Sequence, residues 1–317
     1  MKELKKPLIV LTGPTAAGKT ELSIALAKKL NGAIISADSM QVYKYMNIGS
    51  AKIRPEEMQG VRHYLVDVLD PREEFHVARF QQMAKEAMDE IYRNGQLPIV
   101  VGGTGFYIQA LLKDIDFDES SGELPCRKEL EETARREGGA VLYERLKQVD
   151  PESAEAIHPN NVKRVIRALE FYQETGQPIS LHNKEQKEKQ PPYTYAYFVL
   201  NDDRARLYER IDRRVDRMVE QGLVEEVRCL KEHGYDRSLV SMQGLGYKEL
   251  FPYLDGTCSL EEAVEIIKRD TRHFAKRQIT WFKREPDVIW LNQQEFGYDK
   301  EKILKRMLEL WEERKKS

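Results

Sequence analysis

Residues 8–30 of the chain read LIVLTGPTAAGKTELSIALAKKL, and this stretch decides the fold. The apolar run 8–11 is typical of a buried parallel strand, and residues 21–30 have the composition and spacing of a helix. Between them, residues 13–20 match the pattern G-x-x-x-x-G-K-[ST]. A strand, a glycine-rich turn and a helix in this order predict a phosphate-binding loop at the carboxyl end of a sheet strand.

The chemistry of this loop comes from its backbone and from two side chains. Glycines let the backbone curl so that its N–H groups point inward, and the helix N-terminus adds positive potential. Lys19 supplies a mobile charge, and the Thr20 hydroxyl can ligate Mg²⁺. The pattern does not identify the phosphate ligand, and a nucleoside triphosphate is the default. The alternative to a phosphate site is a glycine-rich turn that serves only in packing. The predicted phosphate site consists of Gly13, Pro14, Thr15, Ala16, Ala17, Gly18, Lys19 and Thr20.

Length and composition limit the number of domains and the class of protein. The 317 residues suggest two domains, or one large domain with an insertion, and 41% hydrophobic residues suffice for a sizeable core. A net charge of −2 excludes a polycationic chain that binds nucleic acid through its overall charge. The three cysteines form no CxxC pair, and no apolar run approaches 18 residues, so we expect a cytoplasmic protein without signal peptide, disulfide framework or membrane span.

Further short apolar runs predict a parallel sheet. Long polar or helical stretches separate most of them, which favours βαβ units and a doubly wound α/β fold of the P-loop NTPase type. Long amphipathic helices are expected over 202–233, 260–283 and 299–316. The predicted strands are Leu8 to Leu11, Ala33 to Ser36, Tyr64 to Leu69, Ile99 to Val101, Tyr195 to Leu200 and Val288 to Leu291.

The pattern changes to charged helices, without a convincing strand, between about 114 and 198. The polar stretches DIDFDESSGELP and KEQKEKQPP flank these helices and have the composition of linkers. We therefore predict an all-helical insertion at 114–198, with helices over 127–137, 141–148 and 161–175. The two parts of the α/β core then comprise residues 1–113 and 199–317. The insertion carries 12 basic and 17 acidic residues, a poor electrostatic match for nucleic acid.

Two further features follow predicted strands at the same edge of the sheet. Asp38 can hold Mg²⁺ through water, accept a proton from a nucleophile, or cap the following turn. The glycine loop at 102–105 allows close backbone approach, and Thr104 offers a hydroxyl to a phosphate or serves as a helix N-cap. The residue pattern leaves these alternatives open.

Arginines supply candidate anion contacts further along the chain. Arg210 and Arg214 lie four residues apart on a predicted helix, so both project from one face and can close over a diphosphate. The alternative is a solvated stripe that pairs with Glu209 and Asp212. The stretch 269–284 mixes cations with aromatic residues, which suits phosphate contacts and base stacking or, for Trp281 and Phe282, core packing. The six histidines have no metal-ligand spacing, and we assign none to a metal.

In combination, these motifs resemble the tRNA dimethylallyltransferases, the tRNA isopentenyltransferase family. The similarity extends from about residue 8 to 292, and the ordered combination is far more specific than the phosphate loop alone. It is carried by GPTAAGKT (13–20), DSMQVYKYMNIGSAKI (38–53), HYLVDVLDP (63–71), PIVVGGTGFY (98–107), KRVIRALEFYQETG (163–176), LYERIDRRVDRMVEQGLVEEV (207–227), MQGLGYKE (242–249) and TRHFAKRQITWFKR (271–284).

The resemblance implies transfer of a dimethylallyl group from dimethylallyl diphosphate to N6 of the adenosine on the 3′ side of a tRNA anticodon. Diphosphate would then occupy the loop, with Mg²⁺ on Thr20, and the partners are the anticodon stem-loop and the prenyl donor; no protein partner is implied. The resemblance assigns catalysis to Asp38, Thr104 and Lys19, with Asp38 taking the amine proton. It implies tRNA contacts by Asp38, Ser39, Met40, Gln41, Thr104, Arg127, Lys163, Arg164, Val165, Ile166 and Arg167.

Two other classes of function compete with this one. A small-molecule or nucleotide kinase is supported by the phosphate loop alone, and the long insertion weakens it. A noncatalytic RNA-binding or nucleotide-sensing module would use the same loops only for binding. For the residues of the insertion, composition alone favours ordinary surface charges.

Overall fold

The computed structural model describes residues 5–117 and 125–316. The chain divides into two compact units, a core unit formed by residues up to 112 and from 192 onwards, and a helical unit at 113–191. The second boundary precedes the expected one at 198 because a core strand already begins at Tyr193. None of the helices in the described ranges has both the length and the apolar character needed to cross a membrane.

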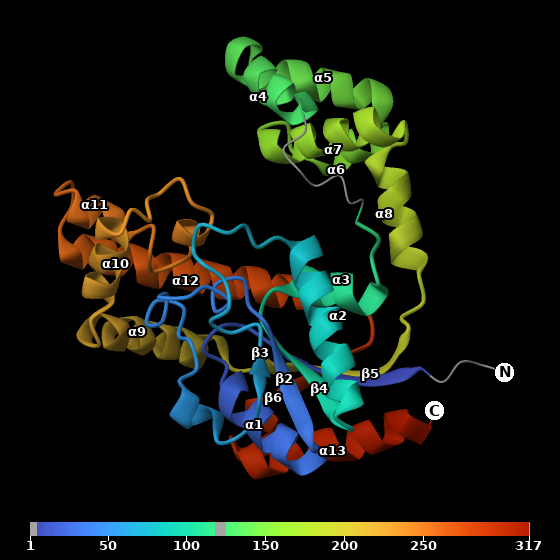
Figure 1. The fold of residues 1–317 in the computed structure, drawn as a ribbon, viewed down its shortest axis with the longest axis vertical. Coiled ribbons are helices and arrows are strands. Elements are labelled where there is room, and N and C mark those ends of the chain that lie inside the picture. Colours follow the sequence, from blue (N-terminus) through green and yellow to red (C-terminus); the bar gives the residue numbers. More distant parts are fainter. Residues whose placement is uncertain (1–4, 118–124, 317) are drawn as a thin grey trace. The chain divides into compact units, whose positions relative to one another are not determined.

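The core unit is built on a six-stranded sheet in which every pair of neighbours is parallel, in the order β3-β2-β4-β1-β5-β6. Figure 1 shows this sheet within the core unit. This topology confirms the predicted doubly wound α/β fold. Strand β1 pairs with β4 on one side and with β5 on the other. The strands are β1 (Lys6–Thr12), β2 (Gly32–Ala37), β3 (His63–Tyr64), β4 (Leu97–Gly102), β5 (Tyr193–Asn201) and β6 (Val288–Asn292).

Successive side chains of β1 point to opposite faces of the sheet and contribute to two hydrophobic layers. Leu8 and Val10 point to one face and pack in a cluster that also contains apolar residues of α2, α3, α10 and α12. Ile9 and Leu11 point to the other face, toward α1 and α13. All four side chains are fully buried, as expected for a strand covered on both sides. The helices are α1 (Lys19–Leu30), α2 (Val77–Arg93), α3 (Gly105–Lys113), α9 (Arg204–Glu220), α10 (Leu223–Glu232), α11 (Leu250–Leu254), α12 (Leu260–Phe282) and α13 (Lys300–Lys316); short 3₁₀ turns are η1 (Pro55–Met58), η2 (Ser241–Gln243) and η3 (Gln293–Phe296).

Two sequence-based elements differ from the structure. The strand expected over 64–69 shrinks to His63–Tyr64, because Leu65 and Asp67 adopt left-handed φ values of 61° and 60° that an extended strand excludes. The single helix expected over 202–233 is broken in two by Gly222, whose φ of 98° leaves the helical region.

The carboxyl ends of the strands bring the candidate residues of the core unit to one edge of the sheet. The phosphate loop follows β1, Asp38 follows β2, and the second glycine loop at 102–105 follows β4. Since all strands run in the same direction, these three segments meet where a doubly wound sheet binds its ligands.

The helical unit has a hydrophobic core of its own. Leu130, Leu142, Leu146 and Val165 are almost completely buried in it. Two of its helices, α6 and α8, were not expected from the sequence; α8 takes up part of the polar stretch at 184–192 that has linker composition. The helices are α4 (Pro125–Glu137), α5 (Gly139–Val149), α6 (Pro151–Ala156), α7 (Val162–Thr175) and α8 (Ile179–Glu188). Of the acidic linker expected at 114–125, residues 118–124 lie outside the described part of the chain.

The two ends of the helical unit are tied to each other. The Lys189 ammonium donates to the backbone oxygen of Asp114 at 3.1 Å and to the carboxylate of Asp116 at 2.6 Å. The backbone N–H of Asp116 donates to Gln186 Oε1 at 3.1 Å. Hydrogen bonds and an ion pair therefore join the chain segments that enter and leave this unit.

Candidate active site

The phosphate loop depends on two glycines. Gly13 has a φ of 143°, and a Cβ there would lie 2.1 Å from the backbone oxygen of Leu200 in β5. Gly18 has a φ of 94° and caps the N-terminus of α1. Both positions exclude a side chain, the first by close packing and the second by backbone conformation. The loop thus curls over the N-terminus of α1 as the sequence predicts.

Lys19 lies against its own loop. Its ammonium donates to the backbone oxygens of Gly13 and Pro14 at 2.9 and 2.8 Å. Burial, together with the positive charges of Arg214 and Arg210, lowers the pKa of Lys19 to about 7, against the opposing effect of Asp38. Among the described residues no carboxylate forms an ion pair with this ammonium. A dianionic ligand in the loop would supply the missing negative charge.

Arg214 of α9 reaches the same loop. Its guanidinium donates to the Thr15 hydroxyl at 3.4 Å, and within the described ranges no carboxylate lies at ion-pair distance from it. Burial and the neighbouring Arg217 and Arg210 lower the pKa of Arg214. Arg214 therefore lies in a cluster of positive charge and has no carboxylate partner of its own among the described residues.

Arg210 is placed differently from its neighbour. It pairs at 3.4 Å with Asp202, whose side chain is completely buried, and its guanidinium lies beside Gly18. The acids expected to pair with a solvated arginine stripe have other partners, since Glu209 pairs with Arg213 and Asp212 with Arg272. The structure therefore directs Arg210 and Arg214 toward the phosphate loop, where a cavity of about 540 Å³ lies between the loop and the arginines of α9.

Asp38 serves as a turn cap and still faces the site. Its Oδ1 accepts from the backbone N–H groups of Met40 and Gln41 at 2.8 and 3.3 Å. Its Oδ2 has no hydrogen-bond or ion-pair partner in the part of the chain that the structure describes. Capping and proton acceptance are therefore compatible, because each uses a different oxygen of the carboxylate.

Ser39 and Met40 line the same cavity as Asp38, whereas Gln41 does not. The Gln41 amide donates to the backbone oxygens of Ala51 and Ser50 at 3.3 and 3.4 Å. Its oxygen accepts from the Ser36 hydroxyl at 3.4 Å. The side chain of Gln41 is thus engaged with the protein and does not line the cavity, and the tRNA contact that the resemblance implies for Gln41 stays a prediction.

The second glycine loop meets the first. Thr104 accepts from the Tyr107 N–H at 3.0 Å through its backbone oxygen and opens α3, and its side chain lines the cavity with Asp38. Thr104 therefore occupies the N-cap position of α3 through its backbone oxygen, and among the described residues its hydroxyl has no hydrogen-bond partner. At Gly103 a Cβ would lie 2.1 Å from the amide nitrogen of Gln278, so that position has no room for a side chain.

Gln278 of α12 was missed by sequence reasoning. Its amide donates to the Gly103 backbone oxygen at 2.9 Å, and its oxygen accepts from the Thr15 N–H at 2.9 Å. The side chain is 7% exposed. Gln278 therefore joins the two glycine loops, and a second amide, from Gln293, supports the phosphate loop through the Ala17 backbone oxygen at 2.9 Å. Gln278 lies within the stretch 271–284 that carries the family resemblance, but neither this stretch nor the sequence around Gln293 indicates these contacts.

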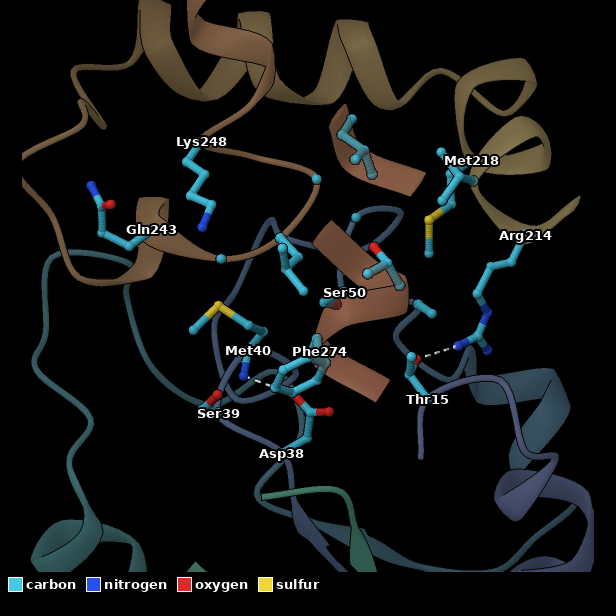
Figure 2. Close-up of a pocket in the computed structure, with 18 of the residues that line it drawn as sticks. Thr15, Asp38, Ser39, Met40, Ser50, Arg214, Met218, Gln243, Lys248 and Phe274 are labelled. Atoms are coloured by element: carbon cyan, nitrogen blue, oxygen red, sulfur yellow. Dashed lines mark hydrogen bonds between the residues drawn. The ribbon is translucent and has the colours of Figure 1, made fainter. Parts of the chain in front are cut away.

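These elements enclose a cavity of about 350 Å³ (Figure 2). Figure 2 shows Asp38 at its base, Thr15 and Arg214 on one side, and Gln243 and Lys248 on the other. The cavity combines an anion-binding side, a carboxylate and an apolar wall. The apolar residues of the lining are Met40, Val215, Met218, Val240, Leu245, Ile267 and Phe274.

The basic stretch 269–284 divides between surface and core. Phe282 is fully buried, as its core alternative predicts. Trp281 packs against the core and lies edge-on to Phe106, with ring centroids 6.2 Å apart. Lys276, Arg277 and Arg284 line a shallow groove beside Trp281, together with His273 and Thr280.

The predicted tRNA-binding residues of the helical unit fall into three groups. Arg127 and Arg167 both pair with Glu170, at 2.8 and 2.9 Å, and the Glu170 side chain is 1% exposed. Val165 and Ile166 are buried in the core of the unit, which corrects the expectation that their side chains contact tRNA. Two exposed cations, Lys163 and Arg164, have no ion-pair partner among the described residues.

Comparison with known proteins gives concordant matches. A family model for IPP transferase matches residues 41–285. The tRNA dimethylallyltransferase of Lachnoclostridium phytofermentans is 64% identical over 309 residues, which cover 98% of each chain. The crystal structure of the full-length tRNA isopentenylpyrophosphate transferase from Bacillus halodurans is 43% identical with a TM-score of 0.74, over 98% of this chain and 99% of that one. A eukaryotic dimethylallyltransferase, captured in crystallographic snapshots acting on tRNA, is 34% identical with a TM-score of 0.80, over 90% of this chain and 74% of its own.

Proposed function

The chain belongs to the IPP transferase family, and from this premise we propose that it transfers a dimethylallyl group from dimethylallyl diphosphate to tRNA. The acceptor atom is N6 of the adenosine on the 3′ side of the anticodon, and diphosphate is released. One observation carries the proposal: Asp38 and the cation Arg214, neither of which has an ion-pair partner among the described residues, line one cavity. This arrangement suits a reaction between an anionic leaving group and a nucleophile that must lose a proton.

The donor diphosphate binds to residues 13–20 with Arg210 and Arg214. Breaking the allylic C–O bond places negative charge on the departing diphosphate. The loop N–H groups, Lys19 and Arg214 stabilise that charge as it develops, which is the form of electrostatic stabilisation that lowers a barrier most. The hydrogen bond from Arg214 to Thr15 supports this placement.

The acceptor enters the apolar part of the cavity as an unstacked base. The N6 lone pair is delocalised into the purine, so N6 is a weak nucleophile, and a carboxylate cannot deprotonate it beforehand. As the new C–N bond forms and the C–O bond breaks, the N6 proton becomes acidic and passes to Asp38. The Oδ2 atom supports this role because the cap of the turn uses only Oδ1.

Three other residues contribute to the acceptor side. Thr104 contacts the reacting centre through its hydroxyl, which is supported by its position in the cavity lining. Ser39 and Met40 contact the adenine, and Gln41 supports them indirectly through the segment that contains Ala51.

Mg²⁺ is the expected cofactor. Thr20 is exposed at the first turn of α1, and its hydroxyl, diphosphate oxygens and water are the hard oxygen ligands that Mg²⁺ takes. When bound, the ion neutralises charge on the diphosphate. Across the described ranges no group of three or more His, Cys, Asp and Glu side chains is arranged to hold a metal. Besides Thr20, the diphosphate and water would supply the remaining oxygen ligands.

The helical unit, corresponding to the insertion expected at 114–198, contacts the tRNA. Lys163 and Arg164 are its exposed cations, and Arg127 and Arg167 can reach phosphates from their positions beside Glu170. A cytoplasmic location, where the three free cysteines stay reduced, completes the proposal.

The test is a product analysis. Purified protein, an anticodon stem-loop RNA, dimethylallyl diphosphate and Mg²⁺ are incubated, and the RNA is digested and analysed by mass spectrometry. We expect one prenyl increment on the adenosine 3′ to the anticodon. No RNA product with the prenyl donor, together with phosphorylation of a small molecule when ATP replaces it, would instead support the kinase alternative.

A further inference from the structure

A short segment of backbone separates two cavities at the site. This segment, the wall segment, comprises residues 47–51 (Asn-Ile-Gly-Ser-Ala). Its residues 49–51 line the cavity that contains Asp38, and Ser50 is visible there in Figure 2. Asn47, Ile48 and Ala51 line a second cavity of about 780 Å³ beside Thr20. The position of the wall segment therefore sets the shape of the site on both sides.

One carboxylate holds the N–H groups of the wall segment. Glu226 Oε2 accepts from the backbone N–H groups of Asn47 and Ile48 at 2.9 and 2.8 Å. Its Oε1 accepts from the Gly49 N–H at 3.1 Å and from the Tyr247 hydroxyl at 2.7 Å. Four donors thus converge on the two oxygens, and three of them are consecutive backbone amides, an arrangement that binds anions.

Tyr247 connects this carboxylate to the opposite side of the cavity. Its side chain is fully buried, and a Cβ at Gly49 would lie 2.5 Å from its ring, so the wall segment packs directly on the aromatic face. Burial and the neighbouring Glu226 raise the pKa of Tyr247, which keeps its hydroxyl protonated as a donor. The residues next to Tyr247 in sequence, Gly246 and Lys248, line the cavity.

The carbonyl side of the wall segment has a separate support. The Gln41 amide donates to the backbone oxygens of Ser50 and Ala51. Glu226 holds the N–H groups and Gln41 holds the carbonyl groups, so both hydrogen-bonding edges of the segment are fixed. An ionised carboxylate suits the first of these tasks because it only accepts, whereas a glutamine would turn an N–H₂ group toward at least one donor.

We infer that Glu226 is a positioning residue of the acceptor cavity. It holds the wall segment and Tyr247 in fixed positions relative to each other, so that the adenine binds with N6 close to Asp38. This inference rests on the proposed function for its consequence in catalysis. It does not place Glu226 in contact with either substrate. A displacement of about 1 Å at such a wall reduces turnover by about 10²-fold.

The kinetic test uses Glu226→Gln with a matched control. Glu225 lies in the same first turn of α10, is exposed and pairs with Arg228 at 2.9 Å, so Glu225→Gln removes the same charge from the same helix end. We expect Glu226→Gln to lower kcat/KM for the RNA about 10- to 100-fold while KM for dimethylallyl diphosphate stays within about twofold. We expect Glu225→Gln to match the wild type. Equal values for the two variants, or a parallel loss with both substrates that follows the folded fraction, would overturn the inference.

A second measurement does not depend on activity. Hydrogen exchange of the amides at 47–49 is followed by mass spectrometry in the wild type and both variants. We expect faster exchange at these amides only in Glu226→Gln, and a smaller change in the same direction in Tyr247→Phe, which keeps the ring and removes one donor. Unchanged exchange in Glu226→Gln would refute the positioning role. Absence of prenyl transfer by the wild type would refute the proposed function and leave this exchange result to decide the local role.

Discussion

Arg167 in α7 and Arg214 in α9 both lie on amphipathic helices, but their surroundings differ. Arg167 shares Glu170 with Arg127, and although burial opposes it, hydrogen bonds from the two arginines lower the pKa of that carboxyl group. Arg214 contacts the Thr15 hydroxyl, and no described carboxylate lies at ion-pair distance from it. The helical unit neutralises the buried charge of Glu170 internally, while the core unit leaves Arg214 without a carboxylate partner among the described residues.

This difference separates two uses of the same residue type. A carboxylate buried with its arginines is satisfied, and removing either partner is destabilising. The charged form of a buried cation that its neighbours repel is disfavoured in the free protein. Binding of an anion stabilises that charged form. Perturbed, unpaired groups in a cavity mark a functional site more reliably than cations on a helix do.

The largest expected effect tests the core side of the comparison. Replacing Asp38 by Ala should lower turnover about 10²–10⁴-fold, because a general base is lost, while RNA binding persists. Single-turnover prenyl transfer and fluorescence anisotropy with labelled stem-loop RNA measure the two quantities.

Asp38→Asn sharpens this test. Asparagine keeps an oxygen that accepts from the Met40 N–H and so preserves the turn, but it takes no proton at neutral pH. We expect it to be as slow as Asp38→Ala. Turnover close to wild type would show that the cap of the turn is the whole role of Asp38.

Removing the unpaired cation is the next test. Arg214→Gln should lower kcat/KM for dimethylallyl diphosphate about 10²–10³-fold, since it deletes a donor that stabilises the leaving group. Arg204→Gln is the control on the same helix, because Arg204 is exposed, lies over the Tyr208 ring and is not part of the lining of the cavity beside the phosphate loop. Arg167→Gln in the helical unit should leave KM for the donor unchanged. A loss of kcat/KM in this variant as large as in Arg214→Gln would contradict the proposed difference between the two arginines.

Lys19 predicts a pH dependence of donor binding. With a pKa of about 7 in the free protein, its ammonium is charged below pH 7 and neutral above. A bound diphosphate favours the charged form, so binding above pH 7 takes up a proton and weakens up to about tenfold for each pH unit. Calorimetry in buffers of different ionisation enthalpy measures the proton uptake. The difference between wild type and Lys19→Ala isolates this group from titration of the diphosphate, and identical uptake would contradict the assignment.

The smallest effect is expected in the helical unit. Changing both Lys163 and Arg164 to Ala should weaken RNA binding a few-fold and reduce the slope of log K against log salt by about 0.7–0.9 for each lost phosphate contact. Changing Arg127 and Arg167 should alter this slope less, because Glu170 offsets one of their two positive charges and holds both side chains. Equal slopes in the two double variants would show that internal pairing does not decide which cations contact RNA.

Sequence reasoning located the local parts of the site. The phosphate loop and Asp38 follow strands whose composition is distinctive, so their approximate positions follow from the parallel sheet. Gln278 and Glu226 act on residues far away in sequence; Gln278 lies 263 positions from Thr15. No local pattern encodes such a contact, and the choice between a paired and an unpaired arginine likewise depends on which acid the fold places nearby.

The helical unit also has a consequence for how the chain folds. Strand β1 needs β5 as a neighbour, and β5 lies beyond the whole helical unit in sequence. Until residues 193–201 leave the ribosome, β1 has an open edge of unpaired amides that invites association. The helical unit has its own core and cross-linked ends at Asp116 and Lys189, so its early folding shortens the effective connection between the two halves of the sheet. We expect chains truncated before residue 193 to aggregate during synthesis, with the helical unit already formed.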